Sequence, residues 1–150
     1  MITVSEVSLR YKTETCFEEK PKLSSPSEAE QFLRKIWEAD TIELHEVFVL
    51  VLLNSALRVL GWSRVSQGSK TGTLVDPIAV AQIAILGNCS SVLCCHNHPS
   101  GRLEASAADI HLTERLVKAL KLFSIGVDDH VILTRDSYMS FREQGLMKER

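Results

Sequence analysis

Residues 96–109 of the chain read HNHPSGRLEASAAD, and a short apolar run, Val92-Leu93-Cys94-Cys95, leads into them. Side chains two positions apart in a strand point to the same side, so His96 and His98 should lie together where that strand ends. Asp109 should then arrive from the first turn of the helix that follows. Two imidazoles and a carboxylate are ligands that zinc accepts, and catalytic zinc sites use three protein ligands with one open position. The stretch therefore predicts a metal centre.

A purely structural explanation exists for half of this pattern. Ser106-x-x-Asp109 also fits a capping box, in which the serine is the N-cap and the acid is the third residue of the helix. A cap would explain both residues without any metal. Two histidines can likewise sit at the end of a strand without binding a metal. The full combination, His-x-His-Pro followed at the right distances by Ser106 and Asp109, is more specific than either part.

The combined pattern, His-x-His-Pro-x6-Ser-x2-Asp, resembles the JAMM (MPN-plus) metalloprotease motif, and the wording His-Asn-His-Pro-Ser-Gly resembles its bacterial RadC-like branch. The resemblance implies a zinc ion, Zn2+, held by His96, His98 and Asp109. It also implies a serine that helps to position the substrate oxygen, here Ser106, and an upstream glutamate that acts as general base. The best match for that glutamate is Glu46, which heads the apolar run 47–53.

The residues alone leave the choice of glutamate open, because Glu43, Glu46 and Glu104 rank almost equally without the family. The resemblance covers residues 25–146 and implies a single α/β domain of JAB/MPN, cytidine-deaminase-like architecture. Residues 1–24 would form an N-terminal extension and residues 147–150 a frayed tail. The helix-hairpin-helix region that the branch commonly carries before this domain has no counterpart in the 24 residues that precede the match.

The hydrophobic pattern predicts the same fold class, a mixed sheet with helices on its faces. Helices are expected over 27–39, where Ser27 would start a capping box, over 77–86, and over 106–123. The middle helix should begin after an Asp76 N-cap and stop at Gly87, and its apolar character all round predicts that it is well buried. Strands are expected over 2–11 (an edge strand), 46–53, 57–66, 91–96, 127–134 and 138–141.

Composition narrows the function and the partners. The 150-residue chain has a net charge of −2, with its basic residues dispersed, which gives no general attraction to a phosphate backbone. A nucleic-acid partner is therefore weakly supported. The longest apolar run has seven residues, Val47 to Leu53, and cannot span a bilayer. The four cysteines form no Cys-x-x-Cys pair, and Cys94 and Cys95 lie in an apolar strand, which predicts buried free thiols and a reducing cytoplasm.

The predicted function is zinc-dependent hydrolysis of amide bonds in a protein or peptide substrate. Glu46 would exchange protons with the attacking water and the leaving amine, and Ser106 could donate to the developing oxyanion, an effect worth about 3 kcal/mol elsewhere. Two alternatives stay open: a nucleic-acid-associated module, and an interaction domain without proteolysis. His130 is expected to hydrogen-bond in the core or behind a ligand, rather than to bind the metal itself.

Overall fold

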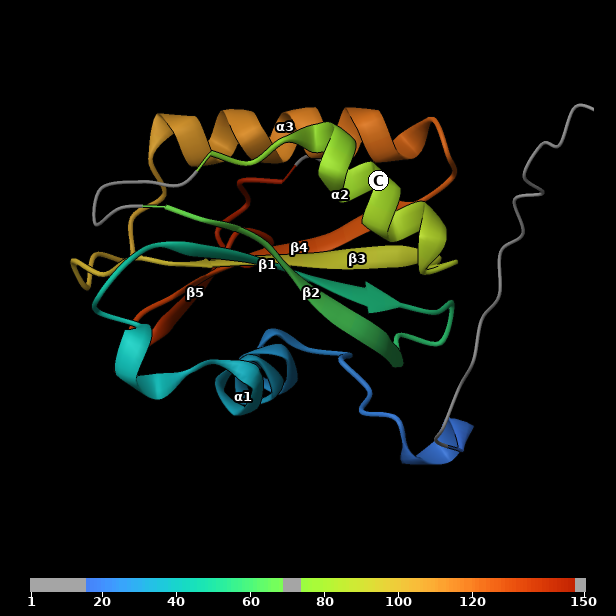
Figure 1. Cartoon of the computed structure of the whole chain (residues 1–150), viewed down its shortest axis with the longest axis horizontal. Coiled ribbons are helices and arrows are strands. Elements are labelled where there is room, and N and C mark those ends of the chain that lie inside the picture. Colours follow the sequence, from blue (N-terminus) through green and yellow to red (C-terminus); the bar gives the residue numbers. More distant parts are fainter. Residues whose placement is uncertain (1–15, 69–73, 148–150) are drawn as a thin grey trace, which may run out of the picture.

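The computed structural model describes residues 16–68 and 74–147, which form one α/β domain in three layers (Figure 1). A mixed five-stranded sheet has the strand order β2-β1-β3-β4-β5. Helix α1 covers one face of the sheet, and α2 and α3 cover the other. The strands are β1 (Val47–Leu53), β2 (Val59–Gln67), β3 (Ser91–Asn97), β4 (Gly126–Leu133) and β5 (Tyr138–Ser140). The helices are α1 (Pro26–Ile36), α2 (Pro77–Leu86) and α3 (Ala107–Lys121), with short 3-10 turns at Phe17–Glu19 and Ala39–Thr41.

The fold class predicted from the sequence is confirmed, including the mixture of strand directions. β1 pairs antiparallel with β2 and β3, β4 pairs antiparallel with β5, and β3 pairs parallel with β4. Helix α3 makes the crossover that this parallel pair needs. The metal-site stretch 96–109 is therefore the link from the central strand into the crossover helix.

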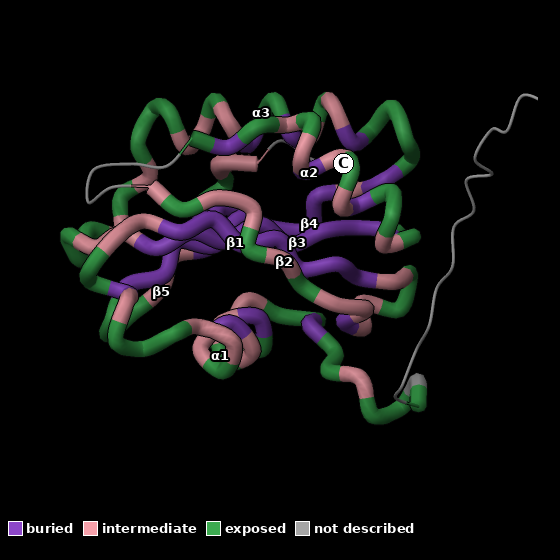
Figure 2. The backbone as a smooth tube through the Cα atoms, viewed as in Figure 1, coloured by how far each residue is buried: buried purple, intermediate pink, exposed green. Residues whose placement is uncertain are grey.

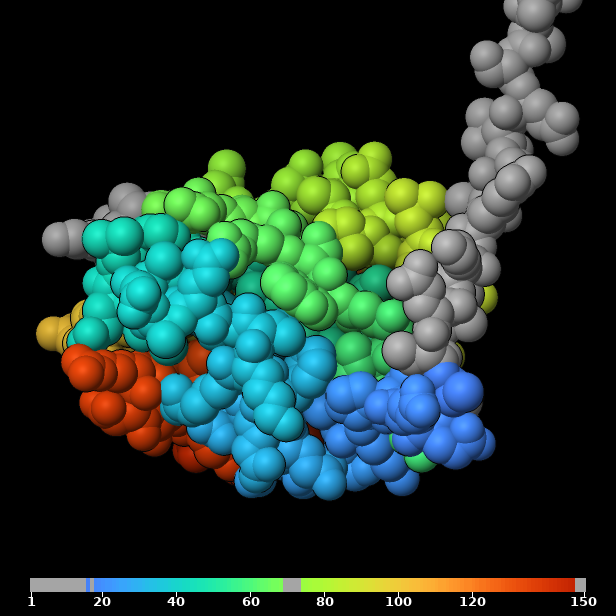
Figure 3. Space-filling model, turned by 60° about the horizontal axis from the view of Figure 1, so that its bottom comes forward, coloured from blue at the N-terminus to red at the C-terminus, as the bar shows by residue number. Residues whose placement is uncertain are grey.

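The central strand β1 is buried on both faces, as its unbroken apolar run predicted (Figure 2). Its odd-numbered residues, Val47 to Leu53, join the core beneath α1. Its even-numbered residues, Phe48, Leu50 and Leu52, join a second core beneath α2 and α3. Figure 3 shows the α1 face, where that helix lies between the chain segment that precedes it and the segment around β5.

Helix α1 begins at Pro26, one residue earlier than predicted, and ends at Ile36, not at residue 39. Its N-cap is Ser25, whose hydroxyl oxygen accepts from the Glu28 backbone N–H at 3.2 Å. The Glu28 carboxylate in turn accepts from the Ser24 backbone N–H at 2.7 Å. Pro26 explains the difference from the predicted Ser27 cap, because a proline lacks the N–H that the first helical position leaves without a partner.

Helix α2 has the predicted ends but not the predicted burial. The Asp76 carboxylate caps it by accepting from the Ile78 backbone N–H at 2.9 Å, and Gly87 is its C-cap. A β-carbon at Gly87 would collide with Leu52, which explains the glycine. Within this helix, however, only Val80 and Ala84 are buried, and Ile78 is 67% exposed. The expectation of a well-buried helix was wrong because α2 lies in an outer layer and presents one side to the sheet.

The remaining boundaries shift by a few residues. β1 starts at Val47, β2 starts at Val59, and α3 ends at Lys121. β2 begins late because Leu57 has a positive φ of 59° in the turn. Phe123, the last residue of the predicted helix over 106–123, lies beyond α3 and is 52% exposed. The edge strand predicted for 2–11 lies outside the described residues. Within the part of the chain that the structure describes, no helix is long and apolar enough to cross a membrane.

Candidate metal centre

The structure brings His96, His98 and Asp109 together, and their candidate ligand atoms all lie within 4.8 Å of one another. His96 lies near the end of β3, His98 follows that strand, and Asp109 lies in the first turn of α3. The two Nε2 atoms are 2.9 Å apart. Nε2 of His96 lies 3.3 Å from Oδ1 of Asp109, and Nε2 of His98 lies 3.5 Å from Oδ2.

These separations are close to the spacing of ligand atoms in a tetrahedral zinc site, with the two histidines facing different oxygens of Asp109. Ligand atoms at about 2.0–2.1 Å from zinc lie about 3.3 Å from one another in a tetrahedron. The observed values are 2.9, 3.3 and 3.5 Å. His96 is 2% exposed, while the side chains of His98 and Asp109 are 14% and 15% exposed. The group is thus largely shielded from water but open on one side.

The His98 ring is oriented by the loop that it begins. Its Nδ1 lies 2.8 Å from the backbone carbonyl oxygen of Arg102, which can only accept a hydrogen bond. Nδ1 of His98 must therefore carry the proton and donate. In the neutral ring this leaves a lone pair on Nε2, which points toward His96 and Asp109. The loop thereby sets His98 in the form that a metal ligand needs.

Asp109 caps helix α3 and also lies where a metal ligand would have to lie. Its Oδ2 accepts from the Ser106 backbone N–H and from the Ser106 hydroxyl, each at 2.7 Å. The Ser106 hydroxyl oxygen accepts in return from the Asp109 backbone N–H at 3.1 Å, which completes the capping box. The same carboxylate faces both imidazoles. Burial would raise the pKa of Asp109, but its contacts with His96, His98 and Ser106 outweigh burial and hold the pKa well below its usual range.

His130 lies directly behind His96 and is fully buried. Its Nε2 is 2.8 Å from Nδ1 of His96, and its Nδ1 is 2.6 Å from the hydroxyl of Thr113. It therefore contacts a candidate ligand without joining the ligand set, in agreement with the role expected from the sequence. Burial is the main reason that the pKa of His130 is well below its ordinary value.

Glu46 lines the same cavity as two of the candidate ligands. This cavity of about 240 Å³ is bordered by Glu46, Phe48, Leu74, Val75, His96, Ala108, Asp109, His111, Leu112 and Arg115. Glu43 borders another cavity, which His98 also borders, and pairs with Arg135 at 3.3 Å, while Glu104 is exposed. Of the three glutamates that the sequence could not separate, Glu46 is the one that borders the cavity of His96 and Asp109. His111, assigned no role from the sequence, also borders the cavity with Glu46.

Two residues that sequence reasoning missed help to hold this arrangement. Asn97 is fully buried, and its amide donates to the backbone carbonyls of Ile42 at 2.6 Å and His45 at 2.9 Å. Its side-chain oxygen accepts from the Val47 backbone N–H at 2.7 Å. Asn97 thus ties the backbone on both sides of Glu46 to the strand that carries His96. The second missed residue is Thr113, which contacts His130 from one turn beyond Asp109.

The three buried cysteines do not contribute to the site. Cys94 and Cys95 are buried within β3, and Cys89 is buried near the end of α2. Burial raises the pKa of the Cys89 thiol to about 11 and of the Cys94 thiol to about 12. Because the thiolate is the form that binds metals, these side chains are poor competitors for zinc.

The fold and the site together define a class: an α/β domain that presents a His-His-Asp group at the junction of a central strand and its crossover helix. The sequence profile of the RadC-like JAB domain matches residues 23–146, which include every residue of this group. The chain belongs to the RadC-like JAB domain family.

Proposed function

We propose that this protein is a zinc-dependent hydrolase that cleaves amide bonds, either peptide or isopeptide, in a protein or peptide substrate. The observation that supports this most strongly is the convergence of three ligand atoms beside a cavity that also contains a glutamate. A zinc ion bound there would supply a Lewis acid that polarises the amide carbonyl and lowers the pKa of a water molecule to about 7.

The residues around the ion would divide the remaining work. His96, His98 and Asp109 would hold the zinc ion through the atoms that already face one another. Glu46 would act as general base, accepting a proton from the attacking water and delivering it to the leaving amine. The cavity that Glu46 shares with His96 and Asp109 gives the substrate a place to enter.

Ser106 has a more restricted role in this proposal than a simple oxyanion donor. Its hydroxyl proton is directed at Oδ2 of Asp109, at 2.7 Å. Its first function would therefore be to orient that carboxylate and start α3. Donation to an oxyanion would require the hydroxyl to turn away from Asp109 as negative charge develops on the substrate.

The decisive test compares Glu46→Gln with wild type, both loaded with one equivalent of zinc. Each protein is incubated with peptide and isopeptide libraries, and the products are identified by mass spectrometry. The variant should bind zinc like wild type and lose cleavage by at least about a hundredfold, as expected for a general base. Glu104→Gln is the matched control, since Glu104 is exposed and outside the cavity, and it should cleave normally.

The same experiment separates the alternative inferred from the sequence, a binding module without proteolysis. That alternative predicts zinc uptake with no cleavage by wild type across the whole library. Turnover that persists in Glu46→Gln would instead remove Glu46 as the base while leaving the hydrolase proposal in place.

A further inference from the structure

We propose that Thr113 is a positioning residue which, acting through His130, fixes the tautomer of His96 so that the Nε2 lone pair faces the metal position. The inference rests on the proposed metal site and adds two residues to it that bind no metal. Thr113 is 3% exposed and His130 is fully buried, so water does not take part in the contacts between them.

The direction of the hydrogen bonds follows from the first one. The Thr113 hydroxyl lies 2.7 Å from the backbone carbonyl oxygen of Asp109, which can only accept, so the hydroxyl proton is donated there. The hydroxyl oxygen can then serve only as an acceptor toward Nδ1 of His130, at 2.6 Å. Nδ1 of His130 must therefore carry a proton.

The same reasoning fixes the proton position on the next ring, His96. A fully buried imidazole with no carboxylate against its ring nitrogens is neutral, so with Nδ1 protonated the Nε2 of His130 holds a lone pair. That lone pair lies 2.8 Å from Nδ1 of His96, which must therefore donate. His96 is left with its Nε2 lone pair directed at His98 and Asp109.

The two candidate histidine ligands are thus set by different acceptors. His98 donates to the Arg102 carbonyl in the loop after β3, whereas His96 depends on a relay that ends on α3. The relay returns to the helix turn that carries Asp109, because Thr113 donates to the Asp109 carbonyl itself. One turn of α3 therefore carries the candidate ligand Asp109 and, through Thr113, also fixes the proton position on His96.

The test uses Thr113→Val, which keeps the side-chain shape but removes the hydroxyl, and Thr113→Ser, which keeps the hydroxyl. Nitrogen-15 NMR of the imidazole rings in the zinc-free full chain reads the proton positions directly. Wild type and Thr113→Ser should show the proton on Nδ1 of both His96 and His130. Thr113→Val should no longer hold both protons on Nδ1. Zinc affinity, measured by competition with a chelator, should fall about tenfold to a hundredfold in Thr113→Val and remain within about threefold in Thr113→Ser.

Two results would overturn the inference: wild type with the His96 proton on Nε2, or Thr113→Val with wild-type tautomers and zinc affinity. The wild-type NMR measurement decides the first even if Thr113→Val does not fold. Failure of the proposed function looks different. A wild type that binds no zinc refutes the metal site, whereas zinc binding that is unaffected in folded Thr113→Val refutes only the relay.

Discussion

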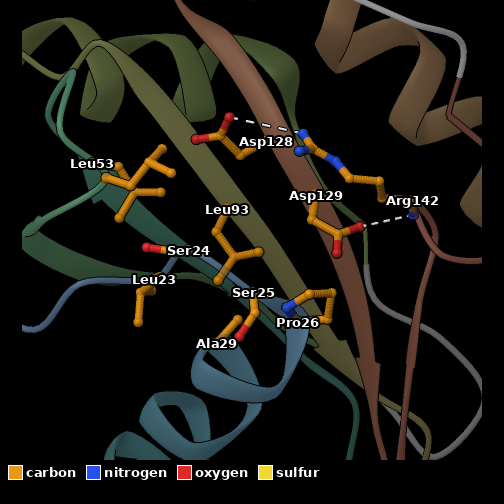
Figure 4. A pocket seen from close by; sticks show the side chains of 11 residues that line it. Leu23, Ser24, Ser25, Pro26, Ala29, Leu53, Leu93, Asp128, Asp129 and Arg142 are labelled. Carbon is orange, nitrogen blue, oxygen red and sulfur yellow. Dashed lines mark hydrogen bonds and ion pairs between the residues drawn. The ribbon is translucent and has the colours of Figure 1, made fainter.

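Two polar clusters of this domain, both largely shielded from water, contain carboxylates. The ligand cluster (His96, His98 and Asp109) lies at the start of α3. The carboxylate pocket, a cavity of about 90 Å³, lies on the α1 side, where Asp128, Asp129 and Arg142 face the start of that helix (Figure 4). Burial and acidic residues are common to both, so neither property can explain why only one of them resembles a metal site.

The carboxylate pocket is satisfied by donors of the protein itself. Oδ1 of Asp129 accepts from the backbone N–H groups of His130 at 2.8 Å and Arg142 at 3.0 Å. Its Oδ2 accepts from the Ser140 hydroxyl. Asp128 accepts from the Ser91 hydroxyl and lies 3.8 Å from the Arg142 guanidinium group. Each carboxylate therefore meets groups that bring a hydrogen or a positive charge.

In the ligand cluster, by contrast, two imidazoles and a carboxylate face one another, while Oδ2 of Asp109 also accepts from Ser106. In the relay proposed above, His96 and His98 donate their Nδ1 protons to the surrounding protein, and both Nε2 lone pairs then face each other and Asp109. A cation is the natural partner for such a group. The comparison teaches that hydrogen-bond direction, more than burial or charge, distinguishes a candidate metal centre from a structural polar cluster.

The largest expected effect separates the clusters by metal binding. Asp109→Ala should weaken zinc binding by more than about a hundredfold, beyond the range expected for a residue that only supports a ligand. Metal content by mass spectrometry after dialysis against a weak chelator measures this. Asp129→Ala should keep the wild-type zinc content. Equal zinc loss in both variants would contradict the distinction.

Asp129→Ala should leave zinc binding unchanged and lower the stability of the fold. It leaves the Ser140 hydroxyl and two backbone N–H groups without their acceptor, which should cost about 1–3 kcal/mol of unfolding free energy. Urea unfolding of zinc-free protein provides the measurement. A variant as stable as wild type would mean that these hydrogen bonds contribute nothing to the fold.

Ser106→Ala should have a smaller effect on both stability and zinc binding. Loss of the N-cap should lower the unfolding free energy by about 1 kcal/mol. Loss of the hydrogen bond to Oδ2 should weaken zinc binding by about tenfold, because Asp109 is less well oriented. Ser140→Ala is the matched control, since it removes a serine hydroxyl from Asp129 and should lower stability only.

The smallest effect concerns pH. Burial raises the pKa of Asp129 in the folded protein, although hydrogen bonds from Ser140 and the backbone oppose this. The unfolded carboxyl, with a pKa of about 3.9, therefore ionises first, and its contribution to stability is lost as the pH rises through the folded pKa. Asp129→Asn removes this titration, so zinc-free wild type should lose stability relative to the variant between about pH 4 and neutral pH. If the unfolding free energies of wild type and Asp129→Asn changed in parallel across that range, the raised pKa would be contradicted.

The sequence predicted the parts of this molecule that depend on local spacing. The period-two relation of His96 and His98 and the helical position of Asp109 were enough to bring the three together. The burial of α2 was mispredicted because an apolar pattern does not say in which layer a helix packs. Asn97 and Thr113 could not be recognised, since their partners are set by tertiary packing: Asn97 bonds to Ile42, and Thr113 bonds to His130.

Glu46 is another residue that sequence patterns alone could not identify. The sequence offered three glutamates, and only a family resemblance favoured this one. Because β1 pairs with β3, the residue before Val47 comes to the end of the strand that carries His96. A position just before β1 thus becomes part of the cavity through strand pairing, which no local pattern encodes.

The most direct test of the metal centre is zinc X-ray absorption spectroscopy on the full chain loaded with one equivalent of zinc. Two histidine nitrogens, one carboxylate oxygen and one further light atom should appear at about 2.0–2.1 Å, with the outer-shell scattering that imidazoles give. The spectrum should change in Asp109→Ala. A sulfur shell at about 2.3 Å, or a spectrum of hydrated zinc without imidazole, would show that these three side chains do not bind the ion.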